Sequence, residues 1–449
     1  MQVEFIIFIY FVFIVGIGVY SAFRIKKPAD YYVAGKKAGL LPVSGSLLAT
    51  ILGGSAILGT IELSHKIGWA ALWFLFSAAL GLFTLIPVSK YVRRFGNYTL
   101  PELLGTFYGK KAEMISSLII PVAWIGIVVA QIIAAAKILH GLGSISYQNA
   151  AIVSGLIFIV YTLLGGQLSI LKTDTLQAVL IIVGLLALFA FASLNPIEHT
   201  FETFRSKALF NSDFTIVDLL ILLLTYSVTF VVGPDIYSRV FCAKDEKTAS
   251  RSILLVALLL LPISFVLTYL GIYAQQSDAG IVSFAEHLLP SWAYGIFIAA
   301  LLSAVMSSAD TTLLTSSMIL SELITGNLNR NNSLKLTRYF IVLIGAASLF
   351  IALYVTSIIQ ALLLALTFFS GAFVVPTLAG LLKLQVNKKR AAFAIIIGGL
   401  IALTGKIINT SGHELAGNLI IVSSYLINAL ILYNFGKNKA TALKNELNI

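Results

Sequence analysis

The segment AALLSAVMSSADTTLL, residues 299–314, carries the most informative pattern in this chain. It places several hydroxyl groups and the carboxylate of Asp310 inside an apolar stretch long enough to cross a bilayer as a helix. Residues spaced by three and four positions share one face of a helix, and here they are Ala304, Ser307, Ser308 and Thr311. Hydroxyls and freed backbone carbonyls suit a small hard cation such as sodium, and an ionisable residue deep in a span usually lines an ion or solute path. Small residues also let membrane helices pack closely, but the cluster together with the aspartate favours an ion site.

The composition indicates a protein that crosses the membrane many times. Of the 449 residues, 59% are hydrophobic and only 11% are charged, and the mean hydropathy is +0.96. Apolar runs close to the ~20 residues of a membrane-spanning helix recur along the whole length. We therefore predict an all-α polytopic membrane protein with about 13 spans. The predicted spans are Val3–Phe23, Leu41–Ser64, Gly68–Ser89, Ile115–Leu139, Ala150–Gly166, Thr173–Leu194, Thr215–Asp235, Ser252–Ala274, Ser291–Glu322, Leu336–Val355, Ile358–Leu382, Ala392–Ile408 and Leu415–Tyr433.

The short connections between spans predict the orientation. Lys and Arg gather in every second connection, for example over residues 24–37, 239–251 and 383–390, whereas the opposite connections hold few, with Arg205 and Lys207 as the main exceptions. Because cytoplasmic loops carry the basic excess, we expect a cell-membrane protein with its N-terminus outside and its C-terminus in the cytoplasm. The same bias accounts for the net charge of +11, so no nucleic-acid partner is expected.

Motifs of other functional classes are missing from the sequence. It contains no GxxxxGK[ST] loop for ATP, no HExxH zinc motif, no GxSxG nucleophile motif and no paired cysteines, since Cys242 is the single cysteine. We therefore expect neither an enzyme nor an ATP-driven pump, with no catalytic residues and no obligate protein partner.

Two predicted spans carry helix-breaking residues within them. The second span contains Gly53 and Gly54, and the seventh contains Gly233 and Pro234 near its inner end. If the second to sixth spans form one repeat and the seventh to eleventh form another, the two breaks occupy corresponding positions. Paired interruptions of this kind indicate a transporter site near the middle of the membrane.

Seven motifs along the chain resemble the sodium:solute symporter family, which includes sodium-coupled proline, sugar, pantothenate and choline transporters. They stand in the family's order and are DYYVAGKKAG (30–39), SLLATILGGSAILGT (46–60), YTLPELLGTFYGKK (98–111), YTLLGGQLSILKTDTLQ (161–177), GPDIYSRVFCAKDEKTA (233–249), SAVMSSADTTLLTSS (303–317) and SGAFVVPTLAGLL (370–382). The resemblance implies sodium-coupled symport by alternating access.

The resemblance also implies the domain organisation. A single transmembrane domain, residues 1–449, would contain a LeuT-type 5+5 core of two inverted repeats at residues 41–194 and 215–382. One extra helix at residues 3–23 would precede this core, and two C-terminal helices at residues 392–433 would follow it.

Carried over position by position, the resemblance implies a sodium site between the second and ninth spans. Its ligands would be the backbone carbonyls of Ala49, Leu52 and Ala304 and the hydroxyls of Ser307 and Ser308. Some members bind a second ion at positions that correspond here to Asp174, Asp310 and Thr311. Because Asp310 replaces a hydroxyl of those members, a second sodium, a proton or a carboxylate on the first sodium all stay open. For Asp174 the alternative is a helix N-cap.

The solute is expected to be small and organic, an amino acid such as proline or a monocarboxylate. The candidate contact residues are Thr50, Gly53, Gln131, Tyr226 and Thr229. The acidic, amide and lysine side chains of the family's sugar transporters have no counterparts at the matching positions, and Ile51 replaces the aspartate of proline transporters. Gln131 has the alternative role of an interhelical hydrogen bond.

Two alternatives to sodium symport stay open at this point. One is proton-coupled symport in which Asp310 carries the proton, and the other is a sensor that binds solute without transporting it.

Overall fold

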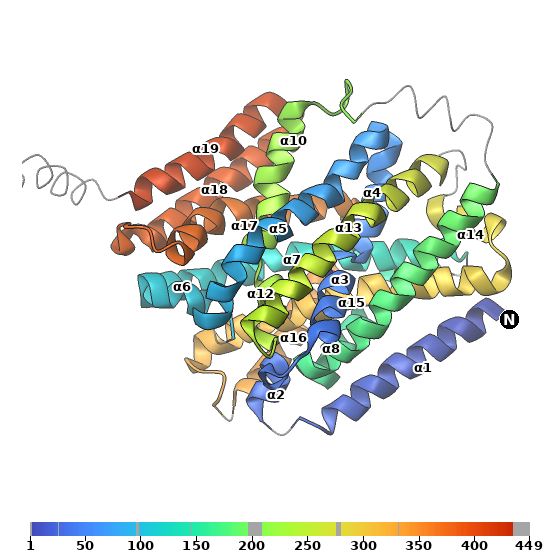
Figure 1. Cartoon of the computed structure of the whole chain (residues 1–449), viewed down its shortest axis with the longest axis horizontal. Helices are drawn as coiled ribbons and strands as arrows, with labels where there is room; N and C mark the ends of the chain where they lie inside the picture. The colour runs from blue at the N-terminus through green and yellow to red at the C-terminus, as the bar shows by residue number, and fades with distance from the viewer. Residues whose placement is uncertain are drawn as a thin grey trace, which may run out of the picture.

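A computed structural model describes residues 2–25, 27–95, 98–143, 145–195, 209–274, 280–330 and 332–433. Within these ranges the chain is helical, with isolated β-bridges and no strand (Figure 1). The predicted loop charges at Arg205 and Lys207 lie outside the described residues.

Most consecutive helices of the described residues are joined by short connections. The first half contains α1 (Gln2–Ala22), α2 (Pro28–Val33), α3 (Leu40–Ile51), α4 (Gly54–Ile67), α5 (Leu72–Phe95), α6 (Leu100–Tyr108), α7 (Lys110–Gly141), α8 (Tyr147–Leu194) and α10 (Ile216–Leu222). The second half contains α11 (Val228–Val232), α12 (Pro234–Cys242), α13 (Glu246–Ala274), α14 (Gly280–Leu288), α15 (Ser291–Thr325), α16 (Ser333–Ala352), α17 (Ile358–Leu381), α18 (Ala391–Thr410) and α19 (Glu414–Leu432). Short 3₁₀ segments η1 (Ala34–Lys36), η2 (Gly68–Ala71) and η4 (Lys388–Arg390) and a π-helical turn η3 (Leu223–Ser227) complete the chain.

The described residues contain 11 helical segments that are long and apolar enough to cross a membrane. One of these segments joins α4 to α5, and the apolar helices Leu40–Ile51 and Tyr147–Leu163 are too short to be included. These helices match the predicted spans closely, whereas the exact number of 13 stays a prediction.

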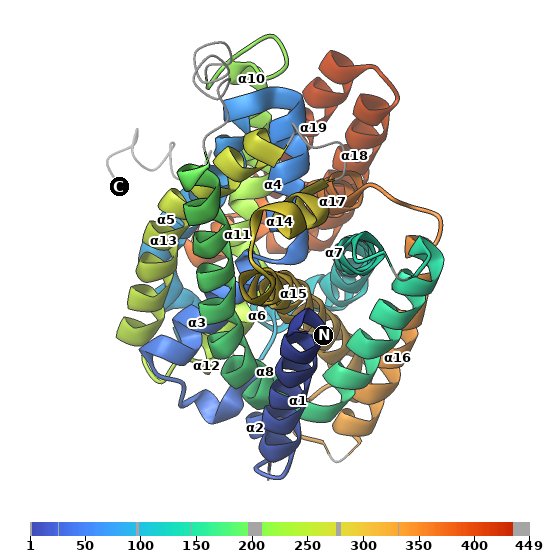
Figure 2. The ribbon, with the colours of Figure 1, turned by 90° about the vertical axis from the view of Figure 1, so that its right-hand side faces the viewer.

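Helix α15 forms the centre of the molecule. It packs against α8, α7, α16, α1 and α3, and Figure 2 shows it surrounded by other helices. Nearly all of its side chains are buried, from Ala293 near one end to Thr325 at the other. A membrane helix this polar can be enclosed because its serines and threonines bond to carbonyls of their own helix, as Ser303 does to Ala299 at 2.7 Å.

The first predicted break lies between α3 and α4. Leu52 (φ −81°, ψ 38°) and Gly53 (φ −60°, ψ 165°) leave helical geometry before α4 resumes at Gly54. A Cβ atom at Gly53 would overlap Ser308, and one at Gly54 would overlap Val305 of α15. The two glycines therefore allow the interrupted backbone to approach the central helix closely.

The second predicted break lies between α11 and α12. Gly233 is extended (φ −67°, ψ 130°), and Pro234 starts α12, where its missing N–H costs nothing. The π-helical turn η3 precedes α11 and disturbs the regular backbone bonding on that side.

Two details of the sequence prediction are wrong. Helix α12 continues beyond Asp235 to Cys242, so Arg239 lies inside the protein and not in a cytoplasmic connection. Helix α8 bends at Gly166 (φ 55°), and Asp174 lies within the helix that follows, so it does not cap a helix start. Both errors concern charged residues whose partners come from distant parts of the chain.

Single-cysteine labelling will test the orientation. In a Cys242→Ser background, Lys388→Cys lies between α17 and α18 and Ser411→Cys lies between α18 and α19, both at exposed positions. We expect a membrane-impermeant maleimide added to intact cells to label Ser411→Cys and to reach Lys388→Cys only after permeabilisation. The opposite labelling pattern would reverse the predicted topology.

Candidate functional site

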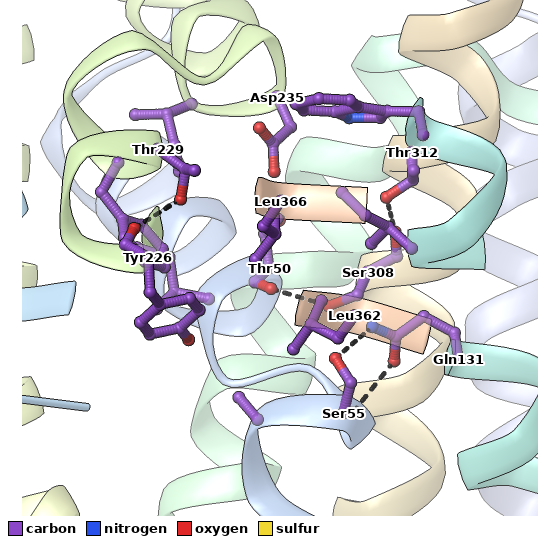
Figure 3. A pocket seen from close by; sticks show the side chains of 16 residues that line it. Thr50, Ser55, Gln131, Tyr226, Thr229, Asp235, Ser308, Thr312, Leu362 and Leu366 are labelled. Carbon is purple, nitrogen blue, oxygen red and sulfur yellow. Dashed lines mark hydrogen bonds between the residues drawn. The ribbon is translucent and has the colours of Figure 1, made fainter. Parts of the chain in front are cut away.

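A small pocket lies where the two broken helices face α7, α15 and α17 (Figure 3). Its volume is about 60 Å³, several times the roughly 10–15 Å³ that a cavity needs to hold one water. Its polar lining consists of Thr50, Ser55, Gln131, Thr229, Asp235, Ser308 and Thr312. Aliphatic and aromatic side chains from the two broken helices, α7 and α17 form the rest of the wall. A mostly apolar pocket with a few convergent polar groups is the usual form of a small-molecule site.

The end of α3 presents free carbonyl groups beside α15. Because α3 stops at Ile51, its last carbonyls lose their helical donors. The N–H of Leu52 still bonds the Leu48 carbonyl at 2.8 Å, but no backbone N–H of the described residues bonds the carbonyls of Ala49 or Leu52. Two of the five predicted sodium ligands are therefore available to a cation.

The serine pair of α15 faces this end of α3. Ser308 Oγ donates a hydrogen bond to the Thr50 carbonyl at 2.7 Å and so ties α15 to α3. Ser307 Oγ is fully buried, lies close to the Asp174 carboxylate and makes no hydrogen bond of normal geometry with a described residue. Ala304, one turn earlier on α15, is also fully buried. Of these residues, Ser307 is the one whose hydroxyl still lacks a hydrogen bond of normal geometry, so a small cation beside it would supply a partner.

A buried arginine organises the predicted second ion site. Arg239 of α12 has no exposed surface and pairs with Asp174 of α8, with Nη2 3.2 Å from Oδ2. The Arg239 guanidinium also donates hydrogen bonds to four hydroxyls, namely Ser46 Oγ at 3.0 Å, Ser238 Oγ at 2.9 Å, Thr50 Oγ1 at 2.8 Å and Thr311 Oγ1. Two members of the predicted second ion site, Asp174 and Thr311, therefore already contact a positive charge that belongs to the chain.

Two carboxylate oxygens in this network have no partner. Asp174 Oδ1 and Asp310 Oδ2 are buried and receive no hydrogen bond from a described residue. The two carboxylates repel each other electrostatically. When both are ionised, two negative charges face the single charge of Arg239, so a proton or a cation is needed to neutralise this part of the interior. A second sodium here would have to share Asp174 with Arg239.

The predicted solute-contact residues differ in whether they line the pocket and in whether their hydroxyl groups already form hydrogen bonds. Tyr226 and Thr229 line the pocket, and Thr229 Oγ1 donates to the Tyr226 carbonyl at 2.6 Å. Thr50 also lines the pocket, but its hydroxyl accepts a bond from Arg239. Gly53 is packed against Ser308 and is not part of the pocket lining.

Gln131 joins two helices at the edge of the pocket. Its Nε2 donates to Ser55 Oγ at 2.7 Å, and the Ser55 N–H donates to its Oε1 at 3.3 Å (Figure 3). The interhelical role that was the alternative for Gln131 is therefore present in the structure.

Several pocket residues were not predicted, and three of them bear on the chemistry of the site. Asp235 follows the Gly-Pro break directly, and a carboxylate beside a break in a membrane helix is the signal that could have identified it. Thr312 lies one turn beyond Ser308 on the same face of α15, and its Oγ1 donates to the Ser308 carbonyl at 2.6 Å. Trp124 is placed by packing of α7 on α17, where its ring meets Phe369 edge-on at 4.6 Å, and sequence spacing does not reveal such a contact.

Free carbonyls at one helix break, buried serine hydroxyls on the facing helix and a pocket beside a second break are features that suit a site for a cation and a solute within a membrane protein. Sites of this kind define secondary active transporters built around discontinuous helices.

The chain belongs to the sodium:solute symporter family, whose sequence profile matches residues 31–399. It is 26% identical over 424 residues to the sodium/pantothenate symporter of Escherichia coli K12, covering 87% of this chain and 88% of that protein. It is 26% identical over 390 residues to a sodium/proline symporter of Haemophilus influenzae, covering 75% of this chain and 74% of that protein. The expected family, and with it sodium-coupled symport of a small organic solute, is confirmed.

The fold is similar to those of solved transporters. A Na⁺-coupled sialic acid symporter in a substrate-bound outward-open state matches with a TM-score of 0.76 and 19% identity, over 96% of this chain and 98% of that one. A nucleobase-cation-symport-1 family transporter in a closed conformation matches with a TM-score of 0.58 and 12% identity, over 89% of this chain and 92% of that one. The expected LeuT-type architecture is confirmed.

Neutralising Arg239 is expected to destabilise the protein strongly. Arg239→Gln leaves Asp174 buried without its cation, and removal of one partner from a buried ion pair typically costs about 3–5 kcal/mol. We expect the thermal unfolding midpoint of the detergent-purified variant to fall well below that of the wild type. The double variant Arg239→Gln/Asp174→Asn, which removes both charges, should recover part of the loss. A single variant as stable as the wild type would contradict this role of the pair.

Proposed function

We propose that a sodium ion bound between α3 and α15 drives uptake of a small organic solute held in the adjacent pocket. The ligands of the ion would be the carbonyl groups of Ala49, Leu52 and Ala304 and the hydroxyl groups of Ser307 and Ser308. The observation that carries this assignment is the end of α3, where the carbonyls of Ala49 and Leu52 accept no backbone N–H of the described residues and α15, which carries the buried Ser307 and Ser308 hydroxyls, packs beside it.

Coupling between ion and solute follows from residues that the two sites share. Thr50 and Ser308 both line the pocket, and the hydrogen bond between them joins α3 to α15. A sodium ion on the neighbouring carbonyls would hold the same two segments together and so favour the conformation in which the pocket is complete. Rocking of the helices would then open both sites toward the cytoplasm.

The membrane potential supplies part of the free energy that drives this coupled transport. One positive charge that moves inward across 100 mV contributes about 2.3 kcal/mol. Because a tenfold concentration ratio across the membrane corresponds to about 1.4 kcal/mol, this energy supports roughly fifty-fold accumulation of a neutral solute from the voltage alone.

The proposed solutes are an amino acid such as proline or a monocarboxylate. Relatives of this chain are named as proline and pantothenate symporters, and the pocket volume of about 60 Å³ favours a compact molecule. Tyr226, Thr229 and Gln131 would contact it through side chains, whereas Thr50 and Gly53 would shape the backbone beside it.

The proposed arrangement in the plasma membrane has the N-terminus outside and the C-terminus inside. Residues 41–194 and 215–382 would form the two inverted repeats, with residues 3–23 and 392–433 outside this core. The two breaks, at Gly53 and Gly233, then fall in the first helix of each repeat.

A second candidate function is proton-coupled symport. Asp310 favours it, because its Oδ2 is buried without a partner and a proton there would neutralise the excess negative charge beside Arg239. In that case a proton would accompany sodium as a second coupling ion.

Removing either serine hydroxyl is expected to weaken sodium binding. Ser307→Ala and Ser308→Ala each delete one proposed ligand, and loss of a polar contact to a charge corresponds to roughly 10–100-fold in affinity. We expect the sodium concentration for half-maximal uptake into proteoliposomes to rise accordingly, with Ser303→Ala, one turn earlier on α15, as the control. Unchanged sodium dependence in both variants would refute the assigned site.

Replacement of Asp310 will distinguish coupling to sodium from coupling to a proton. If sodium is the sole driver, Asp310→Asn should retain sodium-driven uptake with altered sodium affinity. If the proton is the driver, an imposed proton gradient should drive uptake by the wild type but not by Asp310→Asn. Proteoliposomes with either gradient imposed will distinguish the two results.

A further inference from the structure

Asp235 brings a carboxylate into the pocket at the second helix break. It is the second residue of α12, directly after Pro234, and it lines the pocket with its side chain partly exposed to the cavity. In Figure 3 its carboxylate points into the space between Thr229 and Thr312. An ionisable side chain inside a membrane protein is expensive to maintain, so its presence in a solute pocket calls for a partner.

No positively charged side chain of the described residues pairs with Asp235. Its nearest basic neighbour is Arg239, one turn further along α12, which donates to Asp174 and to surrounding hydroxyls. The one bond from Arg239 to Asp235 goes to the backbone carbonyl, at 3.5 Å. The carboxylate lies near the backbone N–H groups at the start of α12, and its side chain lines the cavity.

The rest of the pocket supports a ligand that carries a positive charge. Trp124, Tyr226 and Phe230 supply aromatic surfaces around the same space, and aromatic faces attract cations. Trp124 also has a buried indole N–H without a partner among the described residues, so a bound molecule with an oxygen acceptor would satisfy it.

We propose that Asp235 binds a protonated amine of the solute, so that the transported molecule is an amine-bearing compound, such as an amino acid, and not a simple monocarboxylate. The inference rests on the proposed transport function and selects one of its two solute classes. An ammonium group would form charge-assisted hydrogen bonds with the carboxylate, and a carboxylate of the same solute would be able to accept the Trp124 N–H.

Two other roles for Asp235 make different predictions. A carboxylate at a helix start stabilises the helix dipole, and in that role its removal would weaken the fold without changing which solutes bind. A carboxylate that ligates sodium would, when removed, weaken the effect of sodium itself. The amine-binding role affects neither sodium binding nor carboxylate-only solutes.

The test measures thermal stabilisation of the full-length protein purified in detergent, since a ligand that binds only the folded state raises the unfolding midpoint. Sodium is compared with potassium at equal concentration, and solutes are then added in the presence of sodium. The probes are the common amino acids, pantothenate and two matched pairs in which a carbon replaces the amine nitrogen. These pairs are L-proline with cyclopentanecarboxylate and L-alanine with isobutyrate.

We expect sodium to stabilise the wild type and at least one amino acid to stabilise it further, while the carbon analogues and pantothenate have no effect. In Asp235→Asn, sodium stabilisation should persist and the half-saturating concentration of that amino acid should rise roughly 10–100-fold. Asp235→Glu, which keeps the charge, should retain the preference for the amine. Asp245→Asn serves as the matched control, because Asp245 is an exposed residue that caps α13, with Oδ1 2.6 Å from the Thr248 N–H.

Stabilisation by carbon analogues or pantothenate but by no amino acid would overturn the proposal, as would equal amino-acid affinity in Asp235→Asn and the wild type. Loss of sodium stabilisation in Asp235→Asn would also overturn it and would make Asp235 an ion ligand. Absence of sodium stabilisation in the wild type itself would instead refute the proposed function, so the two failures are distinguishable.

Discussion

A backbone carbonyl inside a membrane needs a partner, and the interruption of α3 leaves carbonyls that have no backbone partner among the described residues. The rest of the site follows from this constraint. Gly53 and Gly54 let the broken segment approach α15. The Ser308 hydroxyl donates to the exposed Thr50 carbonyl, whereas the carbonyls of Ala49 and Leu52 accept no backbone N–H of the described residues. The polarity of α15 is thus matched to the break it faces, and the proposed cation would complete the bonding that neither helix completes alone.

Charge distribution imposes a second constraint on the same region. Asp174, Asp235 and Asp310 are enclosed with a single guanidinium, that of Arg239. Burial of charges in excess of their partners is unfavourable, so the unloaded site has a deficit of positive charge. A sodium ion and a protonated amine would each reduce this deficit. Ion and solute would therefore favour each other through electrostatics as well as through the helices they share.

Local features of the sequence predicted much of this structure. The span boundaries follow from hydropathy, and the breaks follow from glycine and proline, because both depend on nearby residues. The residues assigned to sodium were found through the spacing of Ser307 and Ser308 together with the family resemblance. Arg239 was missed because an arginine near the end of a span looks like a loop charge, and its burial depends on Asp174, 65 positions away in the sequence. Trp124 and Asp235 enter the pocket through packing between distant helices, which spacing along one helix does not reveal.

The position of two opposite charges on one short helix has an electrical consequence. Asp235 and Arg239 are the only charged residues of α12, and they lie one turn apart. When α12 moves through the membrane field, the work done on one charge is largely cancelled by the work done on the other. Movement of this helix alone therefore contributes little gating charge. The voltage dependence of the cycle then falls mainly on the steps that carry the coupling ion.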